Sequence, residues 1–365
     1  MTAQLVDDDV RPTPPSRPRT ERQLSIYAEL SRTVKDAGLL DRRRGWYVAR
    51  IAATVAAFAG IWVGVALLGD SWWQLALAAA LAVVTAQFAF LGHDTAHRQA
   101  FGSHAVNEWS ARVIACGFAG LSYSWWMGKH NKHHNAPNQE GKDPDIAGDG
   151  PLVFTPADAQ TRTGFSAWFT KRQGWAFFPL LTLEGLGLFI AGVQTLVQRK
   201  AMPHRKLELG LIVGRMAAVL AASFLLMPAG LAAVFFVVQL AVFGVLLGAS
   251  FAPNHKGMPL VPENTKVDFL RRQVLMSRNI RGGRFTDFFM GGLNYQIEHH
   301  LFPSMPRPNL RKVQPLVRAF CAENRIGYTE TSLLRSYAIV VRYLNRVGLA
   351  ERDPFSCPLV RQYRV

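Results

Sequence analysis

Charged side chains are missing from three long stretches of this 365-residue chain, which cover residues 51–69, 71–92 and 216–254. Such runs are longer than a typical buried core helix and reach the roughly 18–20 residues that a helix needs to cross a bilayer. They argue against a soluble enzyme with one core, and the composition excludes a disordered or collagen-like chain. We therefore expect an all-α integral membrane protein.

Acidic residues are also few, because 25 Asp and Glu stand against 41 Lys and Arg, which gives a net charge of +16. A basic chain can bind nucleic acid, but here the positive charge flanks the apolar runs, as in the three arginines at residues 42–44. That is the positive-inside pattern of membrane proteins, so we expect no nucleic-acid partner. A mean hydropathy of +0.08 leaves room for a large aqueous part.

Cysteine is scarce as well. Cys116, Cys321 and Cys357 are too widely spaced for a disulfide framework or a zinc-binding motif. This scarcity predicts that the aqueous part faces the reducing cytosol. We expect an integral protein of the bacterial plasma membrane, with its active site and both termini in the cytosol.

Four membrane spans are expected, at about residues 49–69, 72–92, 207–227 and 230–251. Two further apolar stretches are interpreted as interfacial or buried helices. Residues 113–128 are short for a span, and residues 175–198 contain Glu184. If only the second of these crossed, the basic pair Arg199 and Lys200 would lie outside, against the positive-inside bias.

The ends of the chain differ from its middle. Four prolines predict a disordered tail over residues 1–23, and residues 24–40 read as an amphipathic helix that lies against the membrane surface or the cytosolic part, or is simply solvated. The main domain is expected at residues 24–345, followed by a tail at 346–365. Arg215, the one charge well inside the third span, is expected to extend toward the interface.

Histidines cluster just beyond the predicted spans, all on one side. The clusters are His93 and His97; His130, His133 and His134; Gln296, His299 and His300; and the single His255. Spacings of three and four residues place each cluster on one helix face. One such pair alone is typical of a solvated surface, but three clusters on one side predict a metal site. One ion needs three or four ligands, so this many imidazoles indicate two metals, with iron, zinc or copper as candidates.

The three patterns HxxxH, HxxHH and QxxHH, in this order, resemble the histidine boxes of the membrane fatty acid desaturases. Gln296 at the start of the third box is similar to the branch with front-end, linoleoyl-CoA-type and bacterial acyl desaturases. The likeness covers about residues 24–345 and extends to residues 125–126 (WW), 134–138 (HNAPN), 143–146 (DPDI) and 294–303 (NYQIEHHLFP). Eukaryotic front-end members carry a cytochrome b5 domain, whose haem needs two axial histidines. No such domain is expected before the first span here, because His93 is the first histidine.

The resemblance implies a non-haem di-iron centre that uses O2 to introduce a cis double bond into the fatty acyl chain of an acyl-CoA or acyl-lipid. It assigns the metal to His93, His97, His130, His133, His134, His299 and His300, with His255 as the eighth ligand or as a helix cap. Gln296 either ligates weakly or orients a bound water. His104 and His204 are expected to take no part, since neither has a neighbour at ligand spacing.

Further residues near the boxes have two interpretations each. Four carboxylates either orient ligands or serve as helix caps and arginine partners: Asp94, Glu298, Asp143 and Asp145. Trp125 and Trp126 either line the acyl channel or pack at the membrane interface. Five arginines either bind a phosphorylated head group or an acidic electron donor, or form a plain membrane-surface patch: Arg271, Arg272, Arg278, Arg281 and Arg284.

Two other functions compete with desaturation. A related di-iron membrane hydroxylase or monooxygenase, acting on acyl chains or hydrocarbons, would use the same metal site. A metal transporter would place ionisable residues within the spans, whereas Arg215 is the only one away from the ends of the four. The chain shows no GxGxxG after a strand and no CxxxxCxxC spacing. Electrons are therefore expected from outside, from a separate ferredoxin with an NAD(P)H reductase.

Overall fold

The computed structural model describes residues 19–148 and 150–349, and it is almost entirely helical. The long helices are α2 (Arg44–Leu68), α3 (Gln74–Ala96), α8 (Gln173–Gln198), α9 (Arg205–Leu226) and α10 (Ala229–His255). The two short strands of the described residues, β1 (Asn279–Arg281) and β2 (Glu330–Ser332), pair in parallel. The expected all-α membrane architecture is confirmed.

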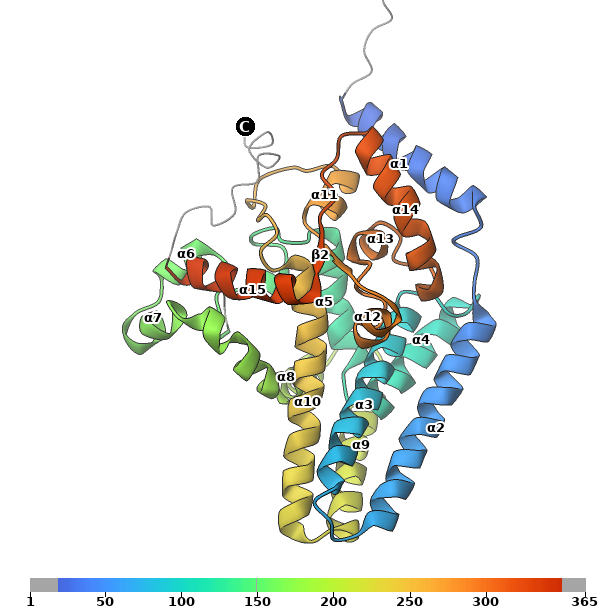
Figure 1. Cartoon of the computed structure of the whole chain (residues 1–365), viewed down its shortest axis with the longest axis vertical. Helices are drawn as coiled ribbons and strands as arrows, with labels where there is room; N and C mark the ends of the chain where they lie inside the picture. Colours follow the sequence, from blue (N-terminus) through green and yellow to red (C-terminus); the bar gives the residue numbers. More distant parts are fainter. Residues whose placement is uncertain (1–18, 149, 350–365) are drawn as a thin grey trace, which may run out of the picture.

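Four of the long helices, α2, α3, α9 and α10, run side by side as an elongated bundle, while α8 crosses α10 obliquely (Figure 1). Within the described residues, five helices are long and apolar enough to cross a membrane, and α8 is one of them. Length and composition therefore allow α8 to cross a membrane too, and the interpretation of residues 175–198 as interfacial or buried stays a prediction. The oblique path of α8 still separates it from the other four, and the number of crossings remains a prediction.

The crossing of α8 over α10 is close because glycines face each other there. A Cβ atom added to Gly185 would lie 2.7 Å from the carbonyl oxygen of Leu240, whereas one added to Gly187 would have nothing within 4 Å. The two backbones can approach only because Gly185 has no side chain.

Gly185→Ala should therefore destabilise the protein by about 1–3 kcal/mol, the usual cost of overpacking a tight contact. The matched change Gly187→Ala, two residues away on α8, should alter stability by less than about 1 kcal/mol, since only helix propensity changes. Thermal unfolding of both variants in detergent measures the difference. Equal unfolding temperatures would show that the glycine contact contributes nothing.

The other apolar stretch, residues 113–128, does not form one helix. It comprises a π-helical segment, η1 (Val113–Ala119), a turn at Gly120 with φ of +76°, and the start of α5 (Tyr123–Asn135). The turn leaves the carbonyl oxygen of Phe118 free, and Arg215 Nε donates to it at 3.3 Å. The expectation that Arg215 extends toward the interface is therefore wrong, because this carbonyl binds it inside the protein.

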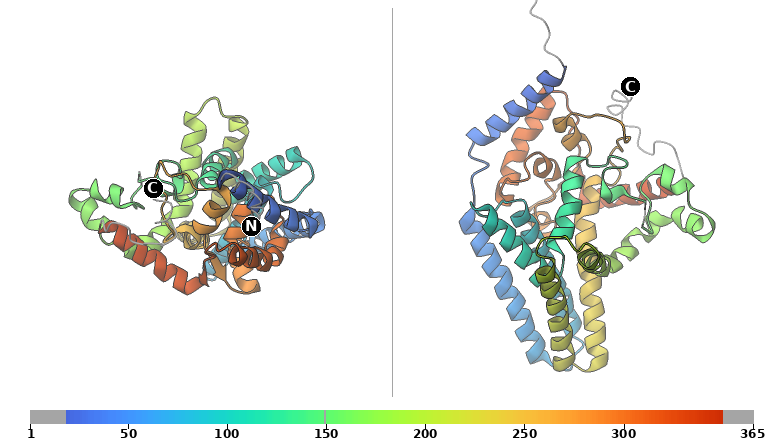
Figure 2. Two further views of the ribbon diagram at one scale, coloured as in Figure 1. Left: turned by 90° about the horizontal axis from the view of Figure 1, so that it is seen from above. Right: turned by 180° about the vertical axis from the view of Figure 1, so that it is seen from behind.

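One end of the bundle is covered by a cap, defined as residues 19–36 and 269–323 (Figures 1 and 2). Its helices are α1 (Arg19–Asp36), α11 (Phe269–Leu275), α12 (Arg284–Phe289), α13 (Gln296–Leu301) and α14 (Arg307–Glu323). Leu30 and Val34 of α1 are fully buried in the same apolar cluster as Val313 of α14. Of the alternatives for the amphipathic helix, packing against the rest of the protein is the one found.

Smaller elements complete the chain: α4 (His104–Arg112), η2 (Pro144–Ile146), α6 (Pro156–Gln160), α7 (Gly164–Thr170) and α15 (Leu333–Gly348). Helix α1 begins at Arg19, before the predicted end of the tail at residue 23, and α15 extends past the predicted boundary at 345. The remaining parts of both predicted tails, residues 1–18 and 350–365, lie outside the described residues.

Candidate metal centre

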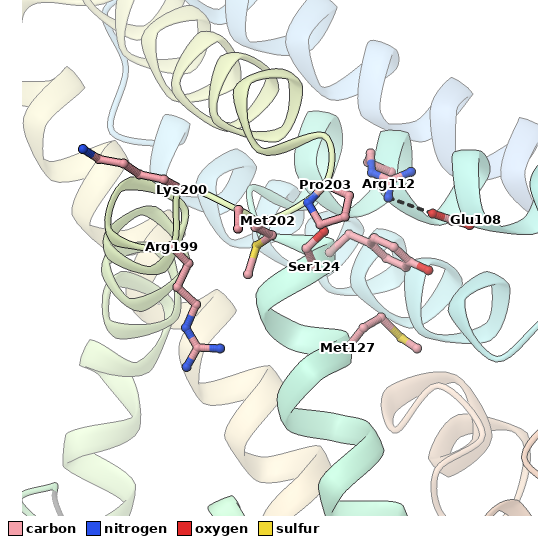
Figure 3. Close-up of a pocket in the computed structure, with 10 residues that line it drawn as sticks. Glu108, Arg112, Ser124, Met127, Arg199, Lys200, Met202 and Pro203 are labelled. Atoms are coloured by element: carbon pink, nitrogen blue, oxygen red, sulfur yellow. Dashed lines mark hydrogen bonds and ion pairs between the residues drawn. The ribbon is translucent and has the colours of Figure 1, made fainter.

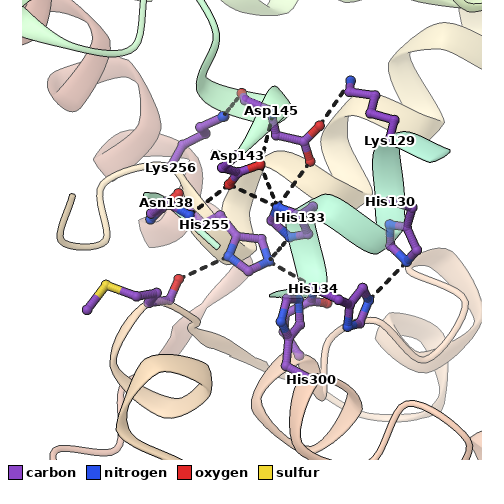
Figure 4. Close-up of polar contacts among 12 residues, drawn as sticks. Lys129, His130, His133, His134, Asn138, Asp143, Asp145, His255, Lys256 and His300 are labelled. Carbon is purple, nitrogen blue, oxygen red and sulfur yellow. Dashed lines mark hydrogen bonds and ion pairs between the residues drawn. The ribbon is translucent and has the colours of Figure 1, made fainter. Parts of the chain in front are cut away.

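Four elements bring the predicted histidine clusters to one place beneath the cap. His93 lies in the last turns of α3 and His97 directly follows that helix; His255 ends α10. The second cluster lies on α5 and the third on the short helix α13. All eight predicted ligands therefore lie at the capped end of the bundle. Figure 4 shows some of them, among them His133, His255 and His300.

Five of the histidines form a first group, in which one ring nitrogen of each lies within 4.8 Å of the others: His93, His97, His130, His134 and His299. The Nε2 atom of His130 is 2.8 Å from that of His97 and 3.0 Å from that of His134. A bond from zinc to imidazole is about 2.0–2.1 Å, so neighbouring ligand nitrogens around one such ion lie roughly 3 Å apart. The spacing of these nitrogens fits one metal ion.

The second group comprises His133, His255 and His300. The Nε2 atoms of His133 and His255 are 3.3 Å apart, and Gln296 Nε2 lies 3.0 Å from His255 Nε2. Asn254 Nδ2 donates to two backbone carbonyls and, at 3.2 Å, to Gln296 Oε1. Since this contact holds the amide oxygen of Gln296 away from the histidines, the arrangement favours orientation of a bound water over ligation.

The other ring nitrogen of each second-group histidine has a fixed partner. The pairs are His133 with Asp143 at 3.0 Å, His255 with the Met276 carbonyl oxygen at 3.0 Å, and His300 with Gln273 at 2.9 Å. Such contacts to Nδ1 orient the ring and leave Nε2 for a metal, as metal-binding histidines usually require.

Buried ring nitrogens without a partner provide an independent test of metal fit. Among the described residues, the Nε2 atoms of His93, His299 and His300 are buried and form no hydrogen bond. A buried polar atom left in this state costs about 1–3 kcal/mol. A metal ion in each group would satisfy these nitrogens, so the residues fit metal. Imidazole is a preferred ligand of iron, zinc and copper.

The protonation states agree with ligation. Burial lowers the pKa of His97, His130, His134, His299 and His300 well below that of free histidine. These rings are neutral at physiological pH, which is the form that binds metals. Burial acts in the same direction on His133, but the carboxylates of Asp145 and Asp143 outweigh it and raise the pKa of that ring.

The four predicted carboxylates have different partners. Asp143 contacts His133 directly, and Asp145 lies 3.4 Å from the same ring and 2.9 Å from Lys129. Asp94 pairs mainly with Arg307, at 2.6 Å, and is 3.6 Å from His93 Nδ1. Among these three, Asp143 alone has a ligand histidine as its principal side-chain partner.

Glu298 faces away from the histidines. Its carboxylate accepts hydrogen bonds of 2.7 Å from Tyr328 and from Asn279 Nδ2, and burial raises its pKa to about 7. Asn279 Oδ1 also accepts from the backbone of Ile297. Glu298 therefore fixes α13 to strand β1, rather than orienting a ring through direct contact.

Trp126 stacks on His130, with ring centroids 4.2 Å apart and planes 21° from parallel. It also meets His93 edge to face at 5.4 Å. Trp126 thus forms a wall of the first histidine group, and both Trp125 and Trp126 are partly exposed. Their role in an acyl channel remains a prediction.

The predicted arginine patch is not one surface. Arg278 is buried and donates to the backbone oxygens of Pro253 and Lys256. Arg272 donates to two backbone carbonyls, and Arg271 pairs with Asp268. The prediction is wrong for Arg278, because this residue, directly before strand β1, points inward. Arg281 and Arg284 remain exposed.

A buried ion pair that was not predicted holds α5 in place. Glu208, in the first turn of α9, is fully buried and accepts from Arg112 Nε at 3.1 Å, from Ser122 Oγ at 2.8 Å and from Ser124 N at 3.1 Å. Ser122 is the N-cap of α5. The carboxylate therefore anchors the helix that carries the second histidine cluster. An acidic residue at the start of an apolar helix was the available signal.

A surface pocket lies beside this ion pair (Figure 3). Residues of α4 and α5 and of the α8–α9 connection line it, among them Arg112, Ser124 and Met202. None of the clustered histidines lines this pocket, so it is separate from the candidate metal centre.

Glu208→Ala should destabilise the protein by about 3–5 kcal/mol and reduce bound metal, because Arg112 would be left buried with less compensation and α5 would lose its anchor. The matched change is Glu108→Ala, since Glu108 pairs with the same arginine but its side chain is 50% exposed. This control should cost about 0–1 kcal/mol. Unfolding temperature and metal content of both variants provide the test, and similar values for the two would contradict the anchoring role.

The bundle and its capped end define a helical integral membrane protein with a histidine-rich cluster that could hold metal. A comparison with protein families narrows this class, because the fatty acid desaturase family matches residues 70–332. Since that match covers most of the chain, the protein belongs to the fatty acid desaturase family, whose named members are oxidoreductases. The predicted family is confirmed.

Individual relatives support the same family. The chain is 31% identical to the acyl-lipid (9-3)-desaturase of Physcomitrium patens over 342 residues, which are 92% of this chain and 65% of the moss protein. It is 28% identical to a Delta(6)-fatty-acid desaturase of Caenorhabditis elegans (94% of this chain, 79% of the relative). It is 30% identical to the Delta(8)-fatty-acid desaturase of Euglena gracilis (93% and 83%). The chain thus spans about two thirds of the moss relative's length.

Proposed function

We propose that this protein is an O2-dependent fatty acyl desaturase that introduces a cis double bond into an acyl-CoA or acyl-lipid. The observation that supports the proposal best is the meeting of eight buried or partly buried histidines in two groups at one end of an apolar helical bundle. The names of the relatives agree with this activity.

Two iron ions are the proposed cofactor, one in each histidine group. With O2, bound iron would supply the oxidant that an unactivated C–H bond requires, which no side chain provides. The protein's own contribution is to hold neutral imidazoles, to orient them through Asp143, Gln273 and the Met276 carbonyl oxygen, and to exclude water by burial.

The position of the site suits a substrate with a long apolar tail. The histidines lie at the capped end of the bundle, so an acyl chain can enter from the membrane while its polar carrier stays at the interface. Trp126, packed on His130, would form a wall beside the chain. We propose that the protein lies in a bacterial plasma membrane and that its capped end faces the cytosol.

Expression in a host without this activity, followed by analysis of fatty acid methyl esters with double-bond localisation, tests the function. We expect a new product that is two hydrogens lighter than its precursor. A product heavier by one oxygen would instead assign the protein to the related hydroxylases. No new product with bound iron present would contradict both.

The electron donor is proposed to be a separate acidic ferredoxin with an NAD(P)H reductase. Arg281 and Arg284 are the exposed residues of the predicted patch. Arg281→Glu with Arg284→Glu should raise the donor concentration needed for half-maximal turnover and leave iron content unchanged, because charge steers association.

Added salt should also raise the donor concentration needed for half-maximal turnover, since the screening length falls from about 10 Å at 0.1 M to about 3 Å at 1 M. Turnover measured against donor concentration provides the test, with Arg32→Glu on α1 as a variant of equal charge change elsewhere. An equal response of Arg32→Glu would place the donor site away from Arg281 and Arg284. Turnover with NADPH alone would contradict the need for a donor.

A further inference from the structure

An aromatic and basic surface stands out from the bundle on α7 and the start of α8, and it takes no part in the metal centre. Its members, here called the aromatic tip, are Phe165, Trp168, Lys171, Arg172 and Trp175. We propose that the aromatic tip binds anionic phospholipids in the leaflet around the capped end, and that it anchors α8 along this leaflet.

The aromatic rings of the tip are exposed to an unusual degree. Phe165, Trp168 and Trp175 are 78%, 52% and 74% exposed. Phe165 and Trp168 stack with centroids 5.5 Å apart, so they form one apolar surface rather than scattered side chains. Contiguous exposed apolar surface marks an interaction site, and Trp is the residue preferred at the membrane interface.

The two basic residues lie beside these rings. The guanidinium of Arg172 sits over the Trp168 ring at 4.8 Å and donates to the Trp168 carbonyl oxygen, and Lys171 is exposed. Neither residue forms an ion pair with a carboxylate in the described ranges 19–148 and 150–349. Their charge is therefore available to the phosphates of anionic lipids, which attract each nearby Lys or Arg.

The tip is held rigidly from behind. Gln173 is buried and donates to the carbonyl oxygens of Val153 and Leu344, both at 2.9 Å. The backbone of Gly174 donates to Asn345 Oδ1 of α15 at 2.9 Å. These contacts fix the start of α8, which carries Trp175, against α15.

The exposed apolar surface continues along α8. Leu183, Ile190 and Val197 are 60%, 42% and 53% exposed, and α8 then leads to the basic pair Arg199 and Lys200. Figure 1 shows α7 beside the upper half of the bundle at the level of α15. After this basic pair, the first turn of α9 binds the start of α5 through Glu208. Both ends of α8 therefore approach the same leaflet.

A second aromatic belt marks the other side of the membrane. Trp72 and Trp73, between α2 and α3, are 71% and 75% exposed at the far end of the bundle. Two belts separated by the bundle are the arrangement that bilayers impose. The aromatic tip belongs to the belt at the capped end, so an anionic leaflet is its partner.

The experiment uses the full chain in vesicles of phosphatidylcholine and phosphatidylglycerol, with Cys357→Ser, because Cys116 and Cys321 are buried. A bimane label at Phe165→Cys reports on the tip. Labels at Leu225→Cys, 84% exposed on the far end of α9, and at Lys312→Cys in the cap serve as lipid and water controls. Quenching is compared for bromine on the acyl chains of each lipid at equal mole fraction.

We expect brominated chains to quench the labels at positions 165 and 225 and to spare position 312. Brominated phosphatidylglycerol should quench position 165 more than brominated phosphatidylcholine, with an enrichment of about fivefold per basic residue, which corresponds to ~1 kcal/mol each. Lys171→Glu with Arg172→Glu should remove this preference without changing position 225.

Two results would overturn the proposal. Quenching of position 165 by aqueous iodide, but not by brominated chains, would place the tip in water. Equal quenching by the two brominated lipids would show that Lys171 and Arg172 do not select anionic head groups.

Discussion

His299→Ala should abolish desaturation and remove most of the metal from the first histidine group. The ring of His299 is 1% exposed, and its Nε2 atom forms no hydrogen bond within the described residues. A group that loses one of its ligands binds its metal ion more weakly, because fewer imidazoles remain to coordinate the ion. Iron content and product formation in purified protein measure both effects.

His104→Ala is the matched control, because His104 starts α4 and belongs to neither histidine group. It should retain most activity and metal. Equal losses of activity and metal in the two variants would contradict the assignment of ligands by their membership of a histidine group. Intact metal in His299→Ala would remove that residue from the ligand set.

Asp143→Asn should weaken metal binding in the second group by about 10–100-fold, the usual effect of removing a group that orients a metal-binding histidine. Asp143 holds His133 Nδ1 and also accepts from the backbone of Asn138 at 2.7 Å and of Asp145 at 2.9 Å. The substitution keeps the size of the side chain but removes the charge that orients the ring. Competition with a chelator, followed by iron analysis, measures the change.

Asp145→Asn is the control for Asp143→Asn, since Asp145 lies farther from the same ring, at 3.4 Å, and its side chain is 38% exposed. Its effect on metal affinity should be much smaller. If Asp145→Asn weakened binding more than Asp143→Asn, the orientation of His133 would depend on the wider charge of the loop rather than on one contact.

Absence of charge was sufficient to locate the bundle helices, because a bilayer tolerates few charges within a span. It located their ends less well. Helix α2 begins at Arg44 rather than at residue 49, since arginines at the interface can remain helical with their charges in water. The length of α8 did not reveal its path, because the close crossing at Gly185 depends on its packing against α10.

The candidate ligands could be predicted from spacing, but their division into groups could not. His133 and His134 are neighbours on α5, yet His134 belongs with His299 and His133 with His255. Successive residues on a helix point about 100° apart, so each faces whichever partners the surrounding helices bring. That choice depends on tertiary packing.

Proximity in sequence also misled in two places. Glu298 precedes His299, but its side chain points to Tyr328 and Asn279. Arg278 lies in a run of arginines, but its side chain points inward, to the backbone oxygen of Pro253. In both cases the local backbone conformation sets the direction of the side chain. Charge pattern and residue spacing do not predict that conformation.

The most direct test of the proposed centre is iron analysis with Mössbauer spectroscopy on the purified full-length protein. Eight converging histidines in two groups predict two irons per chain, with a spectrum of iron bound to nitrogen and oxygen ligands. His299→Ala and Asp143→Asn should each lower this number through a different group. One zinc and no iron per chain would contradict the account.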